Sequence, residues 1–224
     1  EIGQLATGVA HEIRNLLASI RLRLQAAARG IAAGDAEDAV GSLRIVDQEI
    51  ERCIDISGSL LKLSTPSNGV PDLVSLTDVI QEVLSLLGFE AEAREITVAI
   101  DMEPALRVIA PDSEMRMVAI NLAQNAFHAM PNGGTLSIVG RREDRDVVVT
   151  IADQCVGIRP EDLDRIFLPF WSRRAAGVHG TGLGLSICRA IVKRAGGTIT
   201  VASTPGQGSR FTVRIPDADH QDAL

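Results

Sequence analysis

Residues 113–139 decide the fold class, and they read SEMRMVAINLAQNAFHAMPNGGTLSIV. Up to Met130 the apolar residues recur every three or four positions, which is the period of one face of a helix. Pro131 and the glycines after it end this helix, and apolar and polar residues then alternate from Thr135 to Val139 as in a strand. A helix that leads directly into a strand indicates a domain of mixed α and β structure.

The same kinds of segment continue on both sides of this stretch. Upstream, we expect a helix over residues 76–93 and strands over 96–100 and 107–110. Downstream, we expect a strand over 147–152, a helix over 183–195, and strands over 198–202 and 210–215. This irregular interleaving predicts an α+β fold in which helices cover one face of a mixed sheet.

The N-terminal part has a different pattern. Apolar residues recur at helical spacing from Ile2 to Leu24 and again from Ala39 to Leu61, and a glycine-containing turn at residues 30–35 separates the two runs. The pattern predicts an antiparallel helical hairpin. Because one hairpin hides only part of two such stripes, we expect a second copy to complete a four-helix bundle, which makes the protein a homodimer.

The domain organisation follows from these two patterns. Residues 65–72 are rich in turn-forming residues and show no periodicity, which is typical of a linker. The sequence therefore predicts a dimerising hairpin over residues 1–64, a linker over 65–72, an α/β domain over 73–216 and a C-terminal tail over 217–224.

Composition excludes several classes of partner. The 224 residues are 46% hydrophobic and 23% charged, which is enough to form a core. The net charge of -7 argues against nucleic acid and anionic lipid as partners, and the 3% aromatic content argues against stacking platforms for single-stranded nucleic acid.

Cysteine usage and the lack of long apolar runs bear on the compartment. Three widely spaced cysteines form neither a disulfide framework nor a zinc motif, so we expect a reducing, cytoplasmic location. No apolar run reaches the length of a membrane span, and we expect no direct membrane contact in this fragment. The abrupt start at Glu1 suggests a piece of a longer protein. Segments absent here would anchor that longer protein to a membrane.

The first chemical motif is His11-Glu-Ile-Arg-Asn15. His11 and Asn15 share one helix face while Ile13 points to the core, so we expect the imidazole to face solvent. A neutral imidazole is a nucleophile, Glu12 would accept its ring proton, and Asn15 would orient a water. The alternative is a surface histidine beside a chance glutamate. A zinc-protease motif is excluded because Asn15 stands where the second histidine would be.

The second motif is a polar stripe on the helix of residues 113–130, formed by Asn121, Asn125 and His128. Amide oxygens suit Mg²⁺, amide nitrogens donate to phosphate oxygens, and His128 would add a phosphate contact. The alternative is an ordinary solvated face.

Two further motifs would bind parts of a nucleotide. Asp153, at the end of a predicted strand, would accept a hydrogen bond from an exocyclic amine such as that of adenine, although Asp also caps turns. The glycine-rich run Gly180-Thr-Gly-Leu-Gly-Leu185 leads into a helix and would cradle phosphates. It is not a dinucleotide fingerprint, because a polar loop precedes it where that fold needs a strand.

The irregular run from Gln154 to Gly180 is long for a compact domain, and we interpret it as a lid. Phe167-Leu-Pro-Phe170 would be its apolar anchor. Arg173, Arg174 and His179 are candidate phosphate contacts, or else solvated loop residues.

Together these motifs resemble, in order and spacing, the transmitter core of bacterial sensor histidine kinases of two-component systems. The matching segments are the phosphoacceptor box His11–Asn15, the asparagine box Asn121–Ala126, the first glycine box Asp153–Gly157, the phenylalanine box Phe167–Phe170 and the second glycine box Gly180–Leu185. The resemblance spans nearly the whole chain.

The resemblance implies a histidine phosphotransfer domain followed by an ATP-binding domain of the type shared with gyrase, Hsp90 and MutL. It implies that His11 receives the γ-phosphoryl group of ATP, that Glu12 is the base, and that the phosphoryl group passes to the receiver domain of a response regulator. Asn15 would support water attack on the phosphorylated regulator. Asn125 would hold Mg²⁺. The residues implied to bind the nucleotide are Asn121, Asn125, His128, Asp153, Gly157, Gly180, Thr181, Gly182, Leu183 and Gly184.

The chain departs from the family pattern at three positions. Leu16 stands where many members have proline, so we expect a proline-type kink to be absent or weaker. Cys155 stands at the first glycine of Asp-x-Gly-x-Gly, where we expect its side chain to resist a positive φ, crowd the base pocket and lower ATP affinity. Gln154 replaces a common asparagine. A thiol sensor at Cys155 is a less favoured hypothesis, because nothing nearby would lower its pKa.

Two other functions compete with the kinase. One is a nucleotide-binding signalling scaffold in which the altered glycine box abolishes ATP chemistry. The other is an ATPase of the gyrase or Hsp90 kind, in which no residue becomes phosphorylated and His11 has no use.

Overall fold

The computed structural model describes the backbone of residues 2–64, 70–172 and 182–220 and the side chains of residues 13–50, 53, 70–172 and 182–220. The chain divides into two compact units, which are described separately. One consists of Glu1–Pro66 with Pro169–Leu183, and the other of Ser67–Leu168 with Gly184–Leu224.

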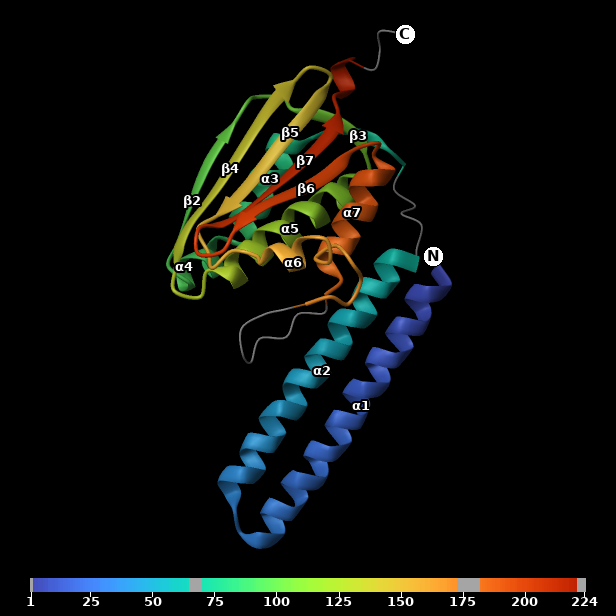
Figure 1. Ribbon diagram of the computed structural model, residues 1–224, viewed down its shortest axis with the longest axis vertical. Coiled ribbons are helices and arrows are strands. Elements are labelled where there is room, and N and C mark those ends of the chain that lie inside the picture. Colours follow the sequence, from blue (N-terminus) through green and yellow to red (C-terminus); the bar gives the residue numbers. More distant parts are fainter. Residues whose placement is uncertain (1, 65–69, 173–181, 221–224) are drawn as a thin grey trace. The chain divides into compact units, whose positions relative to one another are not determined.

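The first unit contains the predicted helical hairpin. Helices α1 (Ile2–Ala33) and α2 (Ala36–Ser64) run antiparallel and pack against each other along their length (Figure 1). The chain reverses at Gly34, where φ is +73°, within the turn expected at residues 30–35, but α1 continues through Gly30 to Ala33. Gly30 is buried, and a Cβ there would lie 3.1 Å from the Ala39 backbone nitrogen. Glycine at this position therefore lets the start of α2 approach closely.

Residue 16, where the sequence departs from the family pattern, is part of the hairpin core. Leu16 is buried and packs against Ile13 on its own helix and Cys53 on α2. Helix α1 is unbroken at this position. A buried leucine with an intact backbone N–H sustains the helix, whereas proline would remove a hydrogen bond.

The second unit has the predicted α+β fold. Its main sheet has the strand order β2-β4-β5-β7-β6, and only the β2–β4 pair is parallel. These strands are β2 (Ile96–Met102), β4 (Gly134–Glu143), β5 (Asp146–Asp153), β6 (Thr198–Thr204) and β7 (Gly208–Pro216). Helices α3 (Leu76–Leu86), α5 (Asp112–Ala129) and α7 (Gly184–Arg194) lie on one face of this sheet (Figure 1). The mixed sheet and its helical cover are confirmed.

The core lies between the sheet and the helices, and alternate residues of the strands point into it. The buried side chains on this face are Leu136 and Ile138 of β4, Val147, Val149 and Ile151 of β5, and Phe211, Val213 and Ile215 of β7. Phe127 of α5 and Ile191 of α7 pack in the same layer. Burying each large aliphatic or aromatic side chain contributes about 1.5–3 kcal/mol to folding, so this layer holds the helices on the sheet.

Three elements differ from the sequence expectations. The helix expected over residues 76–93 is interrupted at Leu87, which gives α3 and a short α4 (Gly88–Ala93). Strand β1 (Asp72–Ser75) pairs with β3 (Arg107–Ala110) in a separate two-stranded sheet, and α6 (Pro160–Leu163) lies within the run expected to be irregular. The four residues of α6 make little more than one helical turn, which is too short for a helical period to show.

Residues just after β7 are tied to the domain by charge pairs. Asp217 is fully buried and accepts a hydrogen bond of 2.7 Å from Arg142 of β4. Asp219, in the short 3-10 helix η1 (Ala218–His220), pairs with Arg142 and with Arg107 of β3 at 2.7 Å each. These contacts join η1 to both sheets of the unit.

Within residues 2–64, 70–172 and 182–220, no helix combines the length and the apolar character that a membrane span requires.

Candidate functional site

The polar stripe on α5 is present as a half-exposed row. Asn121, Asn125 and His128 are each half-buried, whereas Leu122, Ala126 and Phe127 on the other side of the helix are buried in the core. Helix α5 packs against α7, and a Cβ on Gly184 would lie 3.1 Å from the Asn121 side-chain oxygen. The asparagine stripe and the start of α7 therefore lie side by side.

Asp153 ends strand β5 as a buried carboxylate that is 6% exposed. Its Oδ1 accepts hydrogen bonds of 3.1 Å from the backbone N–H groups of Cys155 and Ser209. Neither bond uses Oδ2. Two backbone donors on one oxygen fix the carboxylate plane, which leaves the second oxygen in a defined direction.

The turn after Asp153 and the β6–β7 turn approach each other too closely for a side chain at position 157 or 208. Gly157 has a φ of +71°, and a Cβ there would overlap the Thr204 carbonyl oxygen. A Cβ on Gly208 would likewise overlap the Asp153 carbonyl. The Gly206 N–H donates to the Val156 carbonyl at 2.8 Å, and this bond locks the two turns together.

Cys155 has an ordinary backbone conformation, which corrects the expected strain. Among the described non-glycine residues, positive φ is confined to Glu95, Ala105, Asp144 and Phe170. The position that needs a left-handed conformation is Gly157, two residues later. A β-carbon at residue 155 therefore costs nothing in backbone energy.

The Cys155 thiol is half-buried beside Asp153. Burial is the main cause that raises the pKa of the thiol above its ordinary value, and the hydrogen bond between the thiol and the Asp153 carboxylate raises it further. The thiol is therefore protonated at neutral pH, and this argues against the thiol-sensor hypothesis, because the thiolate is the reactive form.

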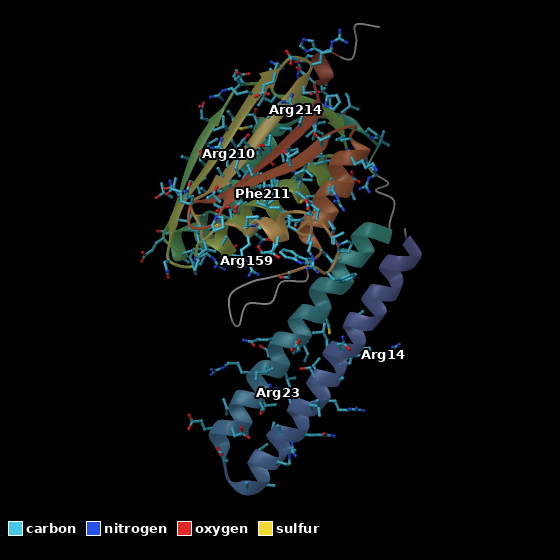
Figure 2. All side chains as sticks on the ribbon, in the orientation of Figure 1. Arg14, Arg23, Arg159, Arg210, Phe211 and Arg214 are labelled. Carbon is cyan, nitrogen blue, oxygen red and sulfur yellow. The ribbon has the colours of Figure 1, made fainter. Side chains whose placement is uncertain are left out.

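The phosphoacceptor motif lies on α1. His11 and Glu12 are part of that helix, and their side chains lie outside the described residues, so their expected orientation stays a prediction. Asn15 is exposed and begins a shallow groove along α1. The groove is lined by Asn15, Ala18, Ser19, Leu22, Arg23, Ala26 and Arg29, of which Arg23 is labelled in Figure 2.

The phenylalanine box begins with an anchored ring. Phe167 is buried and meets Phe211 of β7 edge-on, with ring centroids 6.5 Å apart (Phe211 is labelled in Figure 2). The Arg189 guanidinium of α7 lies 5.5 Å above the Phe167 ring, a cation–π contact. Phe167 is therefore anchored within the second unit by β7 and α7.

Part of the predicted lid and the start of the second glycine box lie outside the described residues. Arg173, Arg174, His179, Gly180 and Thr181 lie outside the described residues. Leu183 is fully buried, and Gly182 has a φ of +68°, where a Cβ would overlap the Phe170 and Trp171 backbone. Only the end of the second glycine box is thus described.

Sequence reasoning missed Ser203 and Ser209. Strand register places Ser209 of β7 opposite both Asp153 of β5 and Ser203 of β6. The Ser203 hydroxyl accepts from the Ile158 N–H at 2.8 Å and donates to the Gly208 carbonyl at 2.7 Å. Both serines sit in ordinary alternating strands, and no local signal distinguishes them.

Among the described residues there is no group of three or more His, Cys, Asp or Glu side chains arranged to hold a metal. A metal at the α5 stripe would therefore be held by amide oxygens together with ligand and water oxygens.

Family comparisons match both units. Residues 1–69 match the His Kinase A (phospho-acceptor) domain, and residues 111–219 match the histidine kinase-, DNA gyrase B-, and HSP90-like ATPase domain. A helical hairpin carrying the first domain, followed by a mixed-sheet domain of the second kind, defines a class of signalling enzymes, the ATP-dependent protein histidine kinases. The chain belongs to the sensor histidine kinases of two-component systems and corresponds to their transmitter core.

Individual relatives agree with this assignment. The sensor histidine kinase ZraS of Salmonella typhimurium is 35% identical over 96% of this chain and 46% of its own length. Sporulation kinase D of Bacillus subtilis is 34% identical over 96% of this chain and 42% of its own length. The chain thus spans less than half the length of these relatives.

Solved structures show the same fold. The catalytic domain of histidine kinase ThkA is 31% identical, with a TM-score of 0.59 over 65% of this chain and 97% of that domain. ThkA in complex with the response regulator protein TrrA gives a TM-score of 0.77 at 27% identity, over 97% of this chain and 62% of that one.

Proposed function

We propose that this chain transfers the γ-phosphoryl group of ATP to His11 and then to an aspartate in the receiver domain of a response regulator. The observation that carries the proposal is Asp153, a buried carboxylate whose Oδ1 is held by two backbone N–H groups. Such a group accepts a hydrogen bond from the exocyclic amine of adenine, and it rejects a base with a carbonyl there.

The remaining nucleotide contacts follow from the elements around Asp153. Gly157 lets the backbone approach the base, and Gly180, Thr181, Gly182, Leu183 and Gly184 would direct backbone N–H groups to the phosphates. The N-terminus of α7 adds its partial positive charge there. His128 would add a phosphate contact from α5. These roles follow the family motifs.

The donor chemistry of α5 fits Mg²⁺, with Asn125 as its ligand and Asn121 close by. Amide oxygens are hard ligands and add no negative charge that would repel a triphosphate. The bound ion would neutralise charge on the β- and γ-phosphates. Glu12 would take the ring proton of His11 and keep the attacking nitrogen basic.

Two partners follow from the helical hairpin. Leu17, Leu24 and Ile31 on α1 and Val40, Leu43 and Ile50 on α2 are exposed, which supports a second copy that buries them in a four-helix bundle. The groove begins at Asn15, which by helical spacing is expected to share a face with His11, and it would receive the response-regulator receiver domain. The ThkA complex with a response regulator supports this partner.

The proposal includes a cytoplasmic location, where ATP and response regulators are found. It keeps the boundaries 1–64 for the dimerisation and phosphotransfer domain, 65–72 for the linker, 73–216 for the ATP-binding domain and 217–224 for the tail.

Labelling with γ-labelled ATP tests the function. The purified chain with Mg²⁺ should acquire an acid-labile, alkali-stable label, as expected of phosphohistidine. His11→Gln should abolish the label and leave nucleotide binding intact, because His11 accepts the phosphoryl group and does not hold ATP. Asn125→Ala should reduce Mg-ATP affinity and labelling together.

Each outcome separates the kinase from its competitors. Undiminished label in His11→Gln would reject the assigned acceptor. ATP hydrolysis without any label on the wild-type protein would favour an ATPase of the gyrase or Hsp90 kind, and ATP binding with neither reaction would favour a scaffold.

A further inference from the structure

Three residues form a row across the end of the sheet where Asp153 lies. Asp153 of β5, Ser209 of β7 and Ser203 of β6 are paired in register. The two serine hydroxyls are 3.1 Å apart, and the Ser209 N–H donates to Asp153 Oδ1. This row supports the carboxylate from the β7 side.

Cys155 supports the same carboxylate from the turn side. Its backbone N–H donates to Asp153 Oδ1 at 3.1 Å, and its Sγ accepts the Gly157 N–H at 3.3 Å. The Sγ also lies 3.8 Å from the Ser209 hydroxyl, so the thiol connects the turn to the row. With glycine at position 155, all the contacts made by Sγ would be missing.

We propose that Cys155 is a positioning residue for nucleotide recognition, whose thiol fixes the turn of residues 153–157 so that Asp153 holds the orientation that selects adenine. The inference rests on the proposed ATP-binding role of Asp153. Glycine at position 155 would leave this turn free to move, whereas the Cys155 thiol restrains it. The thiol is protonated, so it can both donate and accept hydrogen bonds. Cys155 would then strengthen the nucleotide site, whereas the sequence motif led us to expect that it weakens ATP binding.

The effect should appear in base selectivity more than in catalysis. Losing the thiol removes its weak hydrogen bonds with the Gly157 N–H and the Ser209 hydroxyl and loosens the carboxylate, so ATP affinity should fall about 3- to 10-fold in Cys155→Ala. The maximal rate of His11 labelling at saturating ATP should change less than about twofold, because the phosphoryl group reacts elsewhere. The ratio of ATP to GTP affinity should fall by the same factor as ATP affinity.

Conservative and control variants separate positioning from folding. Cys155→Ser keeps a donor and an acceptor and should restore most of the selectivity, whereas Cys155→Gly should behave like Cys155→Ala or bind more weakly. Cys53→Ala, in α2, is the matched control and should leave both affinities unchanged. Thermal unfolding of each variant checks the fold.

The measurement is equilibrium binding of Mg-ATP and Mg-GTP to the whole chain, with labelling rates in parallel. A wild-type chain that binds no ATP would reject the proposed function itself. Wild-type binding with unchanged selectivity in Cys155→Ala, or tighter ATP binding in Cys155→Gly, would overturn only the role of Cys155. If Cys155→Ala does not fold, Cys155→Ser and Cys155→Gly decide, because the proposal requires them to differ in ATP-to-GTP selectivity.

Discussion

Single glycines set the shape of the turn beside Asp153. Gly157 and Gly206 both have positive φ, at +71° and +79°. They differ in their surroundings, because a Cβ on Gly157 would overlap the Thr204 carbonyl, whereas a Cβ on Gly206 would meet nothing within 4 Å. The pair therefore separates the cost of a left-handed backbone from the cost of a clash.

Gly157→Ala should lose both stability and nucleotide binding. Alanine at position 157 or 206 should lower the free energy of unfolding by about 1–2 kcal/mol, because it must adopt the left-handed conformation. Only Gly157→Ala must also move the turn away from β6, so its ATP affinity should fall at least about tenfold. Urea unfolding and ATP titration of both variants check this, and an equal loss of affinity in Gly206→Ala would show that the Thr204 contact is unimportant.

At the scale of elements, α1 carries an apolar stripe that the described part of the chain leaves uncovered. Leu17, Leu24 and Ile31 follow one another at intervals of seven residues and are all exposed. This is the spacing of a coiled-coil seam. Leu22 is also exposed, but it lies about 140° around the helix from Leu17 and lines the groove beside Asn15.

Leu24→Glu should therefore dissociate the proposed dimer, because it would place a carboxylate in the proposed seam between the two copies. Leu22→Glu is the matched control, since it changes an equally apolar residue, 60% exposed against 46% for Leu24, outside the seam. Sedimentation equilibrium should give one chain per particle for Leu24→Glu and two for Leu22→Glu. A dimeric Leu24→Glu variant would move the interface away from this stripe.

At the scale of the whole molecule, the buried Cys188 makes the stability of the folded chain depend on pH. Its thiol is fully buried between α7 and α5, with Sγ 3.9 Å from the Val118 carbonyl, and burial raises its pKa to about 12. In the unfolded chain the thiol titrates near 9.0. Above that pH the unfolded state binds fewer protons than the folded state, so stability falls as pH rises. The chain has no tyrosine that would titrate in the same range.

The free energy of unfolding should consequently drop by about 1–2 kcal/mol between pH 9 and pH 10.5, because the slope rises from half of about 1.36 kcal/mol per pH unit at the unfolded pKa to the full value above it. Cys188→Ala should be less stable at pH 7, because it leaves a small cavity, but its stability should vary less over this interval. Urea unfolding followed by circular dichroism at both pH values measures the difference. Equal pH dependence in both proteins would mean that Cys188 ionises without unfolding.

The sequence alone determined the helical hairpin, the mixed α+β class and the order of the motifs, because helix and strand periods and glycine-rich turns are local signals. It also pointed to Asp153 and the asparagine stripe as chemically unusual positions. It did not determine that α1 continues through Gly30, that β1 pairs with β3, or that Gly184 lies against Asn121.

Only the tertiary structure decided what surrounds Asp153. Ser209 lies 56 residues after Asp153, and its contact arises from the register of β5 against β7. Cys155 looked strained in the motif, yet the left-handed residue is Gly157, because the β6–β7 turn presses on that position. Pairings between distant strands depend on the packing of the whole sheet, and a local pattern of residues does not contain them.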